Sequence, residues 1–302
     1  MTGPGRGTLD VVADLDEALG DQDRPCTRPA VSGAAPAAKA APTRSELMSD
    51  RTSRFSLDGR TALVTGASKG IGAEICRAFA DAGADIVAVG RDRAGLTEVA
   101  ERVTALGREC LVEVCDLEDP AAIDTMMTGL ANRARIDILV NNAGIALIEP
   151  AVSLSLADWD RTMAVNVRAP FQLAQHVAPG MIERGAGRII NVSSQAAVIA
   201  FEDHAAYSAS KGALDALTRG LMSEWARHGI QINAICPTVI LTAMGRKVWG
   251  ADEKSRPMIE RTPARRFGEE VEVADLALFL ASPASGLING ESLMIDGGFS
   301  AV

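Results

Sequence analysis

The fold of this chain is decided by Thr61-Ala62-Leu63-Val64-Thr65-Gly66-Ala67-Ser68-Lys69-Gly70-Ile71-Gly72. The first five residues are a short apolar run, which predicts a buried strand. Glycines follow at the spacing Gly-x-x-x-Gly-x-Gly, and helical periodicity then continues to Gly83. Glycines let the backbone turn tightly around a pyrophosphate, and the start of the helix offers free amide groups to the anion. Without this context the glycines would indicate only a turn; directly after a buried strand they predict a dinucleotide site.

The alternation of strand and helix continues along the rest of the chain. Further strands are predicted at residues 86–89, 111–115, 136–141, 188–192, 231–236 and 292–295. Helices are predicted at residues 93–106, 120–132, 156–183 and 271–281, with one more carrying Tyr207. This alternation predicts an α/β fold, with a single doubly wound parallel sheet of the Rossmann type and helices on both faces. We find no internal repeat and no second domain.

Composition excludes several classes of function. The 302 residues are 47% hydrophobic, enough for a sizeable core, but no apolar run approaches the ~18 residues that span a bilayer. The formal net charge of −9 disfavours nucleic acid as a partner. The cysteines lack the paired spacing of zinc ligands or a disulfide framework, so we expect no metal site, buried thiols and a cytoplasmic location. They are Cys26, Cys76, Cys110, Cys115 and Cys236.

The first 54 residues differ in composition from the rest. They are rich in Pro, Gly and Ala, carry few large apolar side chains and contain acidic residues that fit neither a secretory nor a transit peptide. We therefore predict a disordered extension over residues 1–54 and a catalytic domain over residues 55–302. Met48 begins a compact leader into the first strand, so we expect residues 1–47 to be an upstream extension of the reading frame. Mass spectrometry of the native protein would test this expectation.

Tyr207 is the only tyrosine of the chain, and Lys211 follows four residues later. In a helix this spacing puts both side chains on one face. A phenol has an ordinary pKa of ~10, and a nearby ammonium lowers that value because it favours the phenolate. Such a pair can act as a general acid and base near neutral pH. The spacing alone also occurs by chance in ordinary amphipathic helices.

Several motifs together resemble the short-chain dehydrogenase/reductase family. They occur in the family's order across residues 60–299. The motifs are Thr65 to Gly72, Asp116-Leu117, Asn141 to Gly144, Asn166, Ser193-Ser194, Tyr207 with Lys211, and Asp296-Gly297-Gly298. A less specific likeness lies in Pro237-Thr238-Val239 and the following Thr242-x-Met244-Gly245 with Trp249, which is similar to xylulose reductases and threitol-type polyol dehydrogenases.

The resemblance implies roles for four residues. Ser194 would hydrogen-bond the substrate oxygen, and Tyr207 would give or take its proton. Lys211 would lower the pKa of Tyr207 and bind the nicotinamide ribose, while Asn166 would support a water that relays protons to Lys211. The structural alternatives are a strand-end cap for Ser194, a helix-bending amide for Asn166 and a surface charge for Lys211.

The cofactor set follows from the glycine turn and the resemblance. Arg91 follows the second strand, where a guanidinium suits a 2'-phosphate, and Lys69 adds a second cation, which favours NADP. Asp92 is the complication, because an acid at this edge supports NAD instead. The expected cofactor residues are Gly66, Ser68, Lys69, Gly70, Ile71, Gly72, Arg91, Asp116, Leu117, Asn142, Ala143, Gly144, Tyr207, Lys211, Pro237, Val239 and Thr242.

The substrate side is predicted to lie under a lid at residues 242–262. Candidates there are Gln195, His204, Met244 and Trp249, whereas Glu202 and Asp203 fit solvated loop residues. We expect an NADP-preferring oxidoreductase that acts on a small ketose, a polyol or a related carbonyl or alcohol. The alternatives are a reductase of 3-oxoacyl thioesters or keto-sugar acids, and a cofactor-binding sensor without activity. The resemblance also implies a homotetramer with no nucleic-acid or membrane partner.

Overall fold

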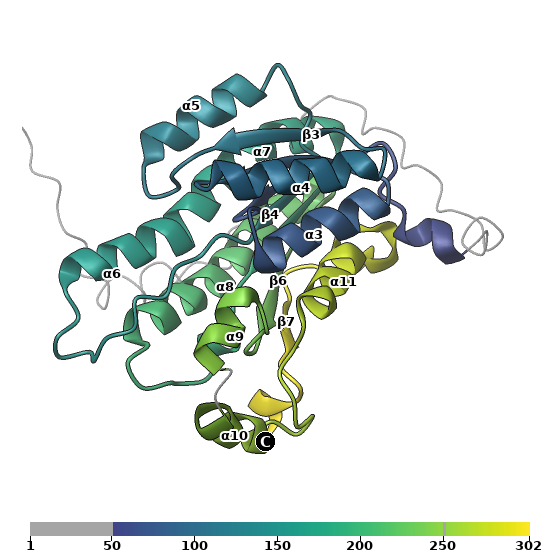
Figure 1. Cartoon of the computed structure of the whole chain (residues 1–302). Coiled ribbons are helices and arrows are strands. Elements are labelled where there is room, and N and C mark those ends of the chain that lie inside the picture. The colour runs from purple at the N-terminus through teal and green to yellow at the C-terminus, as the bar shows by residue number, and fades with distance from the viewer. Residues whose placement is uncertain (1–50, 250–251) are drawn as a thin grey trace, which may run out of the picture. The chain divides into compact units, whose positions relative to one another are not determined.

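The computed structural model describes residues 51–249 and 252–302. Within these ranges seven strands form one parallel sheet in the order β3-β2-β1-β4-β5-β6-β7 (Figure 1). The strands are β1 (Thr61–Thr65), β2 (Asp85–Gly90), β3 (Cys110–Val114), β4 (Ile138–Asn141), β5 (Gly187–Val192), β6 (Ile230–Pro237) and β7 (Ser292–Ile295). The predicted parallel α/β sheet is confirmed, and the strand boundaries differ from the prediction by two residues at most.

Helices cover both faces of the sheet (Figure 1). On one face lie α3 (Gly70–Asp81), α4 (Arg93–Ala105) and α11 (Glu270–Ala281). On the other lie α5 (Pro120–Leu130), α7 (Ala169–Arg184) and α8 (Ala205–Trp225). Successive residues of a strand point to opposite faces, so Ala62 and Val64 pack in the first apolar cluster and Leu63 in the second. Burial on both faces explains why the strands read as continuous apolar runs.

The order of the strands reverses between β1 and β4. The chain first runs outward from β1 to β2 and β3, and then crosses back to β4 on the other side of β1. The ends of β1 and β4 are held side by side by pairing from Ala62 with Ile138 to Val64 with Val140. Ligands bind at such a reversal, beyond the carboxyl ends of the strands. The glycine turn that follows β1 therefore lies at the switch point of the sheet.

The helical region predicted at residues 156–183 is not one regular helix. It consists of α6 (Leu156–Met163), a π-helical turn η2 (Ala164–Arg168) and α7. Pro170 lies in the first turn of α7 and has no N–H to donate to the preceding turn. Widening of the helix by one residue accommodates this missing bond. The turn contains Asn166, so the departure from regular geometry coincides with a predicted site residue.

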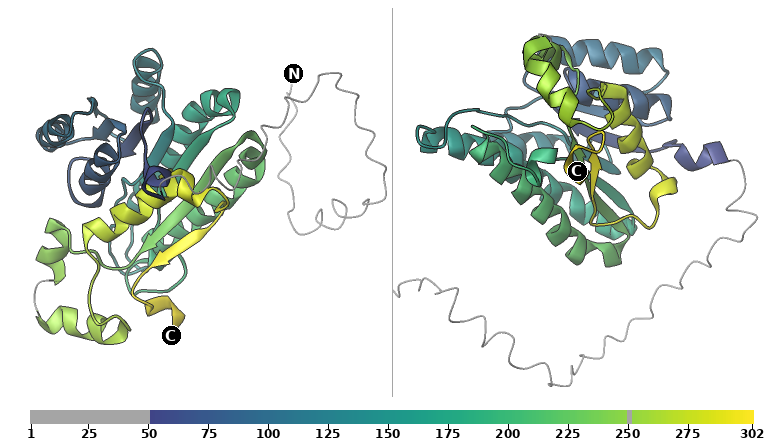
Figure 2. Two further views of the ribbon diagram at one scale, coloured as in Figure 1. Left: turned by 90° about the vertical axis from the view of Figure 1, so that its right-hand side faces the viewer. Right: turned by 90° about the horizontal axis from the view of Figure 1, so that it is seen from below.

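Two predicted segments lie partly outside the described residues. Of the predicted extension, residues 1–50 are outside, while Arg51–Phe55 form a 3-10 helix, η1, across the expected boundary at residue 54. The predicted lid contains α9 (Ala243–Trp249) and α10 (Asp252–Arg261), apart from the helices that cover the sheet (Figure 2). In the part of the chain that the structure describes, no helix has the length and apolar character to cross a membrane.

Candidate active site

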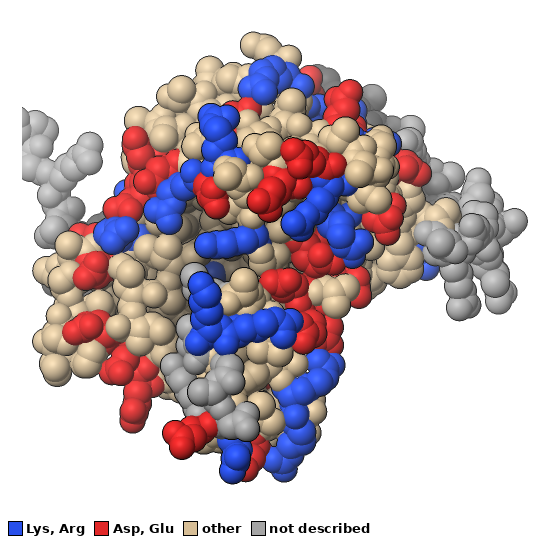
Figure 3. Space-filling model, in the orientation of Figure 1, with Lys and Arg blue, Asp and Glu red and all other residues tan. Residues whose placement is uncertain are grey.

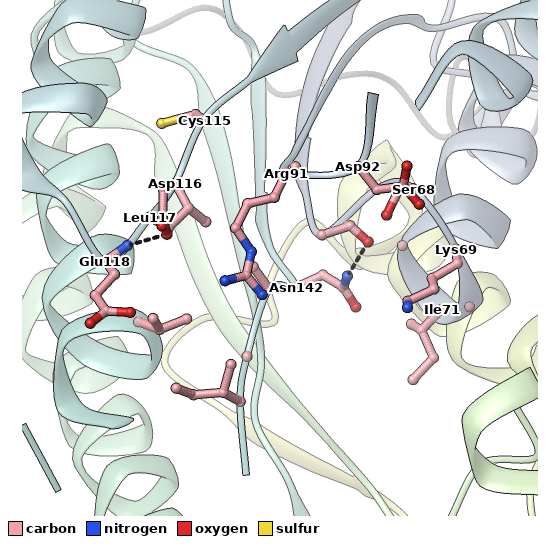
Figure 4. A pocket seen from close by; sticks show the side chains of 18 of the residues that line it. Ser68, Lys69, Ile71, Arg91, Asp92, Cys115, Asp116, Leu117, Glu118 and Asn142 are labelled. Carbon is pink, nitrogen blue, oxygen red and sulfur yellow. Dashed lines mark hydrogen bonds between the residues drawn. The ribbon is translucent and has the colours of Figure 1, made fainter. Parts of the chain in front are cut away.

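A cavity of about 410 Å³ opens beyond the carboxyl ends of β1, β2, β3 and β4 (Figure 4). Its walls come from the glycine turn, from the residues after these strands and from the start of α9. Of the predicted cofactor residues, it is lined by Gly66, Ser68, Lys69, Gly70, Ile71, Gly72, Arg91, Asp116, Leu117, Asn142, Ala143, Gly144 and Thr242. Most of the set predicted from sequence therefore shares one cavity.

The glycine turn fits a pyrophosphate. Gly66 and Gly70 have φ values of +64° and +62°, a region that side chains disfavour. A Cβ at Gly72 would lie 2.3 Å from the carbonyl oxygen of Gly66, so the turn closes only without a side chain there. Lys69, at the N-cap of α3, makes no side-chain capping bond. The first amide groups of α3 remain available to an anion, which is the arrangement that a dinucleotide requires.

Thr65 and Asn142 brace the turn against β4. The Thr65 hydroxyl accepts hydrogen bonds from the backbone N–H groups of Asn142 and Ala143, both at 3.0 Å. The Asn142 amide in turn donates to the carbonyl of Thr65 at 2.9 Å. These reciprocal bonds hold the ends of two neighbouring strands at one separation, so the cavity wall after β4 is more than a plain turn.

Two residues after β2 have different roles: Asp92 caps a helix and Arg91 is a cation in the cavity. Asp92 caps α4, because its carboxylate accepts a hydrogen bond from the Gly95 N–H at 3.2 Å. Arg91 is exposed and extends into the middle of the cavity, and Lys69 lies beside Ser68 and Ile71 at its edge (Figure 4). Asp92 also lines the cavity, but its carboxylate is already hydrogen-bonded at the N-terminus of α4.

Three of the predicted catalytic residues, Asn166, Tyr207 and Lys211, lie close together next to Gly144, which lines the cavity. Lys211 Nζ lies 5.7 Å from the centre of the Tyr207 ring and donates to the carbonyl of Val192 at 2.8 Å. A Cβ on Gly144, which lines the cavity, would lie 3.4 Å from both Lys211 Nζ and Asn166 Oδ1. Strand β4, the π turn and α8 thus bring these side chains together, and Lys211 is buried rather than a surface charge.

Asn166 is fully buried and its amide has three hydrogen bonds. Its Oδ1 accepts from the Ile145 N–H at 2.9 Å, and its Nδ2 donates to the Ile145 carbonyl at 2.9 Å and to the Ser210 hydroxyl at 3.0 Å. A buried amide is costly unless it is paired, and these bonds provide the pairing. Asn166 therefore ties the π turn both to the strand end after β4 and to the helix that carries Tyr207.

The pKa of Tyr207 is raised, whereas the spacing predicted a lowering by Lys211. Burial of the phenol is the main cause; a hydrogen bond with Ser194 opposes it, and the neighbouring Cys236 adds to it. Burial also lowers the pKa of Lys211, to about 8, against the opposing effect of Asp215. In both groups burial is the largest cause of the shift, because it disfavours the charged form of each side chain.

Ser194 and Gln195 follow β5 and are largely buried. The Ser194 hydroxyl accepts a hydrogen bond from the Ala196 N–H at 3.1 Å, which is the capping role considered above, and it also interacts with Tyr207. Gln195 is only 3% exposed, and its Oε1 has no hydrogen-bond partner among the described residues. An unpaired buried oxygen is unusual and leaves Gln195 with an unused acceptor next to Ser194.

The other predicted substrate residues are less completely described. The His204 ring lies 6.3 Å from the Tyr207 ring, and its Nδ1 is hydrogen-bonded to the Glu202 carbonyl. Trp249, at the end of α9, stacks edge-on against Phe267 at 5.6 Å. Met244 lies in α9, but its side chain is outside the part that the structure describes.

Four predicted cofactor residues, Tyr207, Lys211, Pro237 and Val239, are not among those that line the cavity. Pro237 ends β6, and Val239 packs against the apolar cluster of Met258, Phe267 and Phe299. The resemblance alone suggested these positions. The segment that follows them leads to Thr242, which does line the cavity.

Several lining residues were missed by the sequence analysis. They are Gly90, Cys115, Glu118, Ile145, Arg161, Val165 and Ala243. Most are sequence neighbours of predicted residues, so adjacency to a strand end would have found them. Arg161 is different: it comes from α6 and donates from Nε to both oxygens of Glu118 at 3.2 and 3.1 Å. No local pattern signals this contact.

Comparison with known proteins supports a common origin along the whole described domain. A family model described as enoyl-(acyl carrier protein) reductase matches residues 66–300. The chain is 42% identical over 247 residues to D-threitol dehydrogenase of Mycolicibacterium smegmatis, covering 82% of this chain and 95% of that protein. It is 43% identical over 246 residues to L-xylulose reductase of Mus musculus, covering 81% of this chain and 98% of that protein.

A solved structure shows the same likeness. It is a gluconate 5-dehydrogenase from Burkholderia cenocepacia in complex with NADP and tartrate. The TM-score is 0.80 and the sequence identity 39%, and the match covers 84% of this chain and 100% of the other.

Proposed function

Because this chain belongs to the short-chain dehydrogenase/reductase family, we propose that it transfers a hydride between NADP and a small ketose or polyol. It is an NAD(P)-dependent oxidoreductase of CH–OH groups, as are the dehydrogenases and reductases to which it is similar. The observation that carries the proposal is the junction at Gly144, where the cavity wall adjoins both Asn166 and Lys211, with the Tyr207 ring beyond.

The nicotinamide cofactor, when bound, supplies or accepts the hydride. The glycine turn and the free amides of α3 would hold its pyrophosphate, and Gly144 would border the reacting end. Ser194 would hydrogen-bond the substrate oxygen as charge develops there. Tyr207 would donate a proton to that oxygen in reduction and accept one in oxidation. Lys211 would supply a positive charge beside Tyr207. Asn166 would hold the backbone of Ile145 next to it.

A hydroxylated substrate is favoured by the polar groups beside Ser194. The Oε1 of Gln195 is buried and unpaired among the described residues, so it offers an acceptor for a substrate hydroxyl. His204 presents a second polar side chain next to Tyr207. The relatives named for threitol and xylulose support the same substrate class.

A second candidate is the reduction of a keto-sugar acid. The observation that favours it is the likeness to a gluconate 5-dehydrogenase at 39% identity. The two candidates share all the catalytic chemistry and differ only in the charge of the substrate. The description of the matching family model keeps acyl thioesters as a third substrate class to test.

The preference for NADP rests on charge around the cavity. Lys69 and Arg91 line it, and Figure 3 shows Lys and Arg side chains on both sides of a hollow in this face. A guanidinium suits a bidentate contact with a 2'-phosphate. The Asp92 carboxylate, which would favour NAD, caps α4 instead.

We also propose a homotetramer and a cytoplasmic location. The helices after β4 and β5 present a largely apolar hollow that a second copy could cover. It is lined by Met163, Ala164, Val167, Phe171 and Leu217, with Asp160 and Arg168 as its charged members. Among the described residues, Cys76, Cys110, Cys115 and Cys236 are free thiols, which is typical of a reducing compartment.

The role of Tyr207 is tested by Tyr207→Phe. We expect kcat to fall by about 10³-fold, because the only general acid of the mechanism is lost. Cofactor affinity, measured by fluorescence titration, should change little, and so should the melting temperature. Turnover within tenfold of the parent protein would refute the role of Tyr207.

Substrate class is tested by a panel followed through nicotinamide absorbance. Polyols such as threitol, ketoses such as xylulose, gluconate with its 5-oxo form, and acetoacetyl thioesters should each be offered with both cofactors. We expect the highest kcat/KM for a neutral ketose or polyol. A higher value for the sugar acid would favour the second candidate, and silence on all substrates with intact cofactor binding would favour a sensor.

A further inference from the structure

Asp215 is a buried acid that the chemistry described so far does not use. It follows Lys211 by four residues in α8, so both side chains lie on one face of the helix. Only 4% of Asp215 and 3% of Lys211 is exposed to solvent. Acids and amines are rarely buried to this extent unless they are paired or strongly hydrogen-bonded.

The hydrogen bonds that the structure gives the Asp215 side chain do not explain its burial. Its two carboxylate oxygens lie 4.0 and 3.8 Å from the Cys236 Sγ on β6, and a thiol is a weak donor. The pKa of Cys236 is raised to about 12, first by burial and then by Asp215, so this partner stays a neutral thiol. The buried cation next to Asp215 is Lys211, one helical turn before it on the same face of α8.

Among the described residues, the groups around the Lys211 ammonium include a single carboxylic acid, Asp215. The ammonium is held by the Val192 carbonyl at the end of β5, with the Tyr207 ring 5.7 Å away. The groups that face it are Tyr207 and Asp215 from α8, the Val192 carbonyl from β5, Cys236 from β6, and Gly144 with Asn166 from the side of the cavity. Of these, Asp215 is the carboxylic acid, and its charge opposes the loss of the Lys211 proton.

We propose that Asp215 is the buried counter-charge that keeps Lys211 protonated, and that this positioning residue sets the upper pH limit of carbonyl reduction. The inference rests on the proposed role of Lys211. Without the carboxylate, desolvation of the ammonium is opposed by neutral groups alone, so Lys211 releases its proton at a lower pH. The reaction then loses the cation beside Tyr207 at a pH where the parent protein still holds it.

The experiment compares Asp215→Asn, which keeps the shape and removes the charge, with Glu224→Gln. Glu224 is an exposed acid on the same helix, so its substitution changes net charge equally without reaching Lys211. In the pH profile of kcat/KM for reduction, we expect the alkaline limb of Asp215→Asn to move down by about one pH unit. Asp215→Glu, which retains a carboxylate, should return the limb toward its parent position. An unmoved limb in Asp215→Asn, or equal movement in Glu224→Gln, would overturn the proposal.

A second measurement does not depend on activity. In protein labelled with ¹³C-lysine, the Cε resonance of Lys211, assigned by its loss in Lys211→Met, reports the titration of the ammonium directly. Its midpoint should fall in Asp215→Asn and stay in place in Glu224→Gln. If the midpoint falls but no substrate is turned over, the role of Asp215 is correct and the proposed function is wrong. If the midpoint does not change in Asp215→Asn, the role of Asp215 is refuted. If Asp215→Asn does not fold, Asp215→Ser removes the charge with a smaller side chain.

Discussion

Lys211 is the residue whose chemistry depends most on its neighbours. Its ammonium is buried beside a phenol, a thiol and a carboxylate, and burial lowers its pKa to about 8 from an ordinary value of 10.5. The unfolded chain would hold this proton up to about pH 10.5, whereas the folded chain releases it near pH 8. Between these values the unfolded state binds more protons, so the free energy of unfolding rises with pH on account of Lys211.

This sign predicts the behaviour of Lys211→Met. Relative to the variant, the parent protein should gain stability as the pH rises from about 8 to 10.5, by about 3 kcal/mol in total. Urea unfolding of both proteins across this range, without cofactor, measures the difference. Lys247→Met, in the exposed face of α9, is the control and should show no such trend. Parallel stability curves for the parent and Lys211→Met would contradict the low pKa of Lys211.

Arg91 is the second residue with a specific prediction. If its guanidinium holds the 2'-phosphate, Arg91→Ala should raise the KM for NADPH by about tenfold or more and leave the KM for NADH nearly unchanged. Arg93→Ala provides a matched control, because Arg93 is equally exposed two residues later and does not line the cavity. Equal effects of Arg91→Ala on both cofactors would show that the residue does not read the phosphate.

At the scale of elements, one loop and one helix are joined across the cavity. The loop between β3 and α5 carries Glu118, whose carboxylate receives Arg161 from α6 and whose carbonyl receives Arg168 from the π turn. The wall of the cavity near Asp116 is thereby tied to the segment that holds Asn166. Breaking the tie should loosen the cofactor site without touching the reacting groups.

Loss of the contact between Glu118 and Arg161 should change the KM for the cofactor but not kcat. Glu118→Gln should raise the cofactor KM about two- to fivefold, the range expected for a partly exposed ion pair, with kcat nearly constant. Glu113→Gln breaks the pair with Arg133, a contact of 2.6 Å from the same strand region that does not line the cavity, and serves as the control. The double variant Glu118→Arg with Arg161→Glu exchanges the two charges and should restore part of the cofactor affinity. A matching change in Glu113→Gln would show that the effect is not specific to the cavity.

At the scale of the whole molecule, an apolar surface remains on the helices that follow β4 and β5. Phe171 on α7 is 38% exposed and lies beside Leu217 of α8 in the hollow described above. A large aromatic side chain at this exposure, among apolar neighbours, is typical of an interface.

We expect Phe171→Glu to lower the assembly state measured by light scattering after size-exclusion chromatography, since a charge at this surface would have to be buried on association. Leu106→Glu is the control, because Leu106 is 42% exposed at the end of α4, away from these helices. A parent protein that is already monomeric would refute the proposed tetramer, and unchanged assembly in Phe171→Glu would move the interface elsewhere.

Local patterns were sufficient for the elements and for most of the cavity. The apolar run of β1 with its glycine turn located the switch point, because both signals lie within twelve consecutive residues. Spacing likewise paired Tyr207 with Lys211. The helical region expected at residues 156–183 is confirmed, but apolar periodicity does not register the π turn before Pro170. The tie between Arg161 and Glu118 was missed because the two residues are 43 positions apart.

The sequence by itself determined the parallel α/β fold, the phosphate turn and the family, since each depends on residue type at short, regular spacing. Only the tertiary structure decided the electrostatics. The pKa of Tyr207 depends on how much water the phenol loses, and burial raises it, opposite to the lowering that spacing alone suggested. The same holds for Asp215, which reads as one more polar residue of α8 until β6 brings Cys236 against it. Desolvation is a property of the packed molecule, because elements distant in the chain exclude the water.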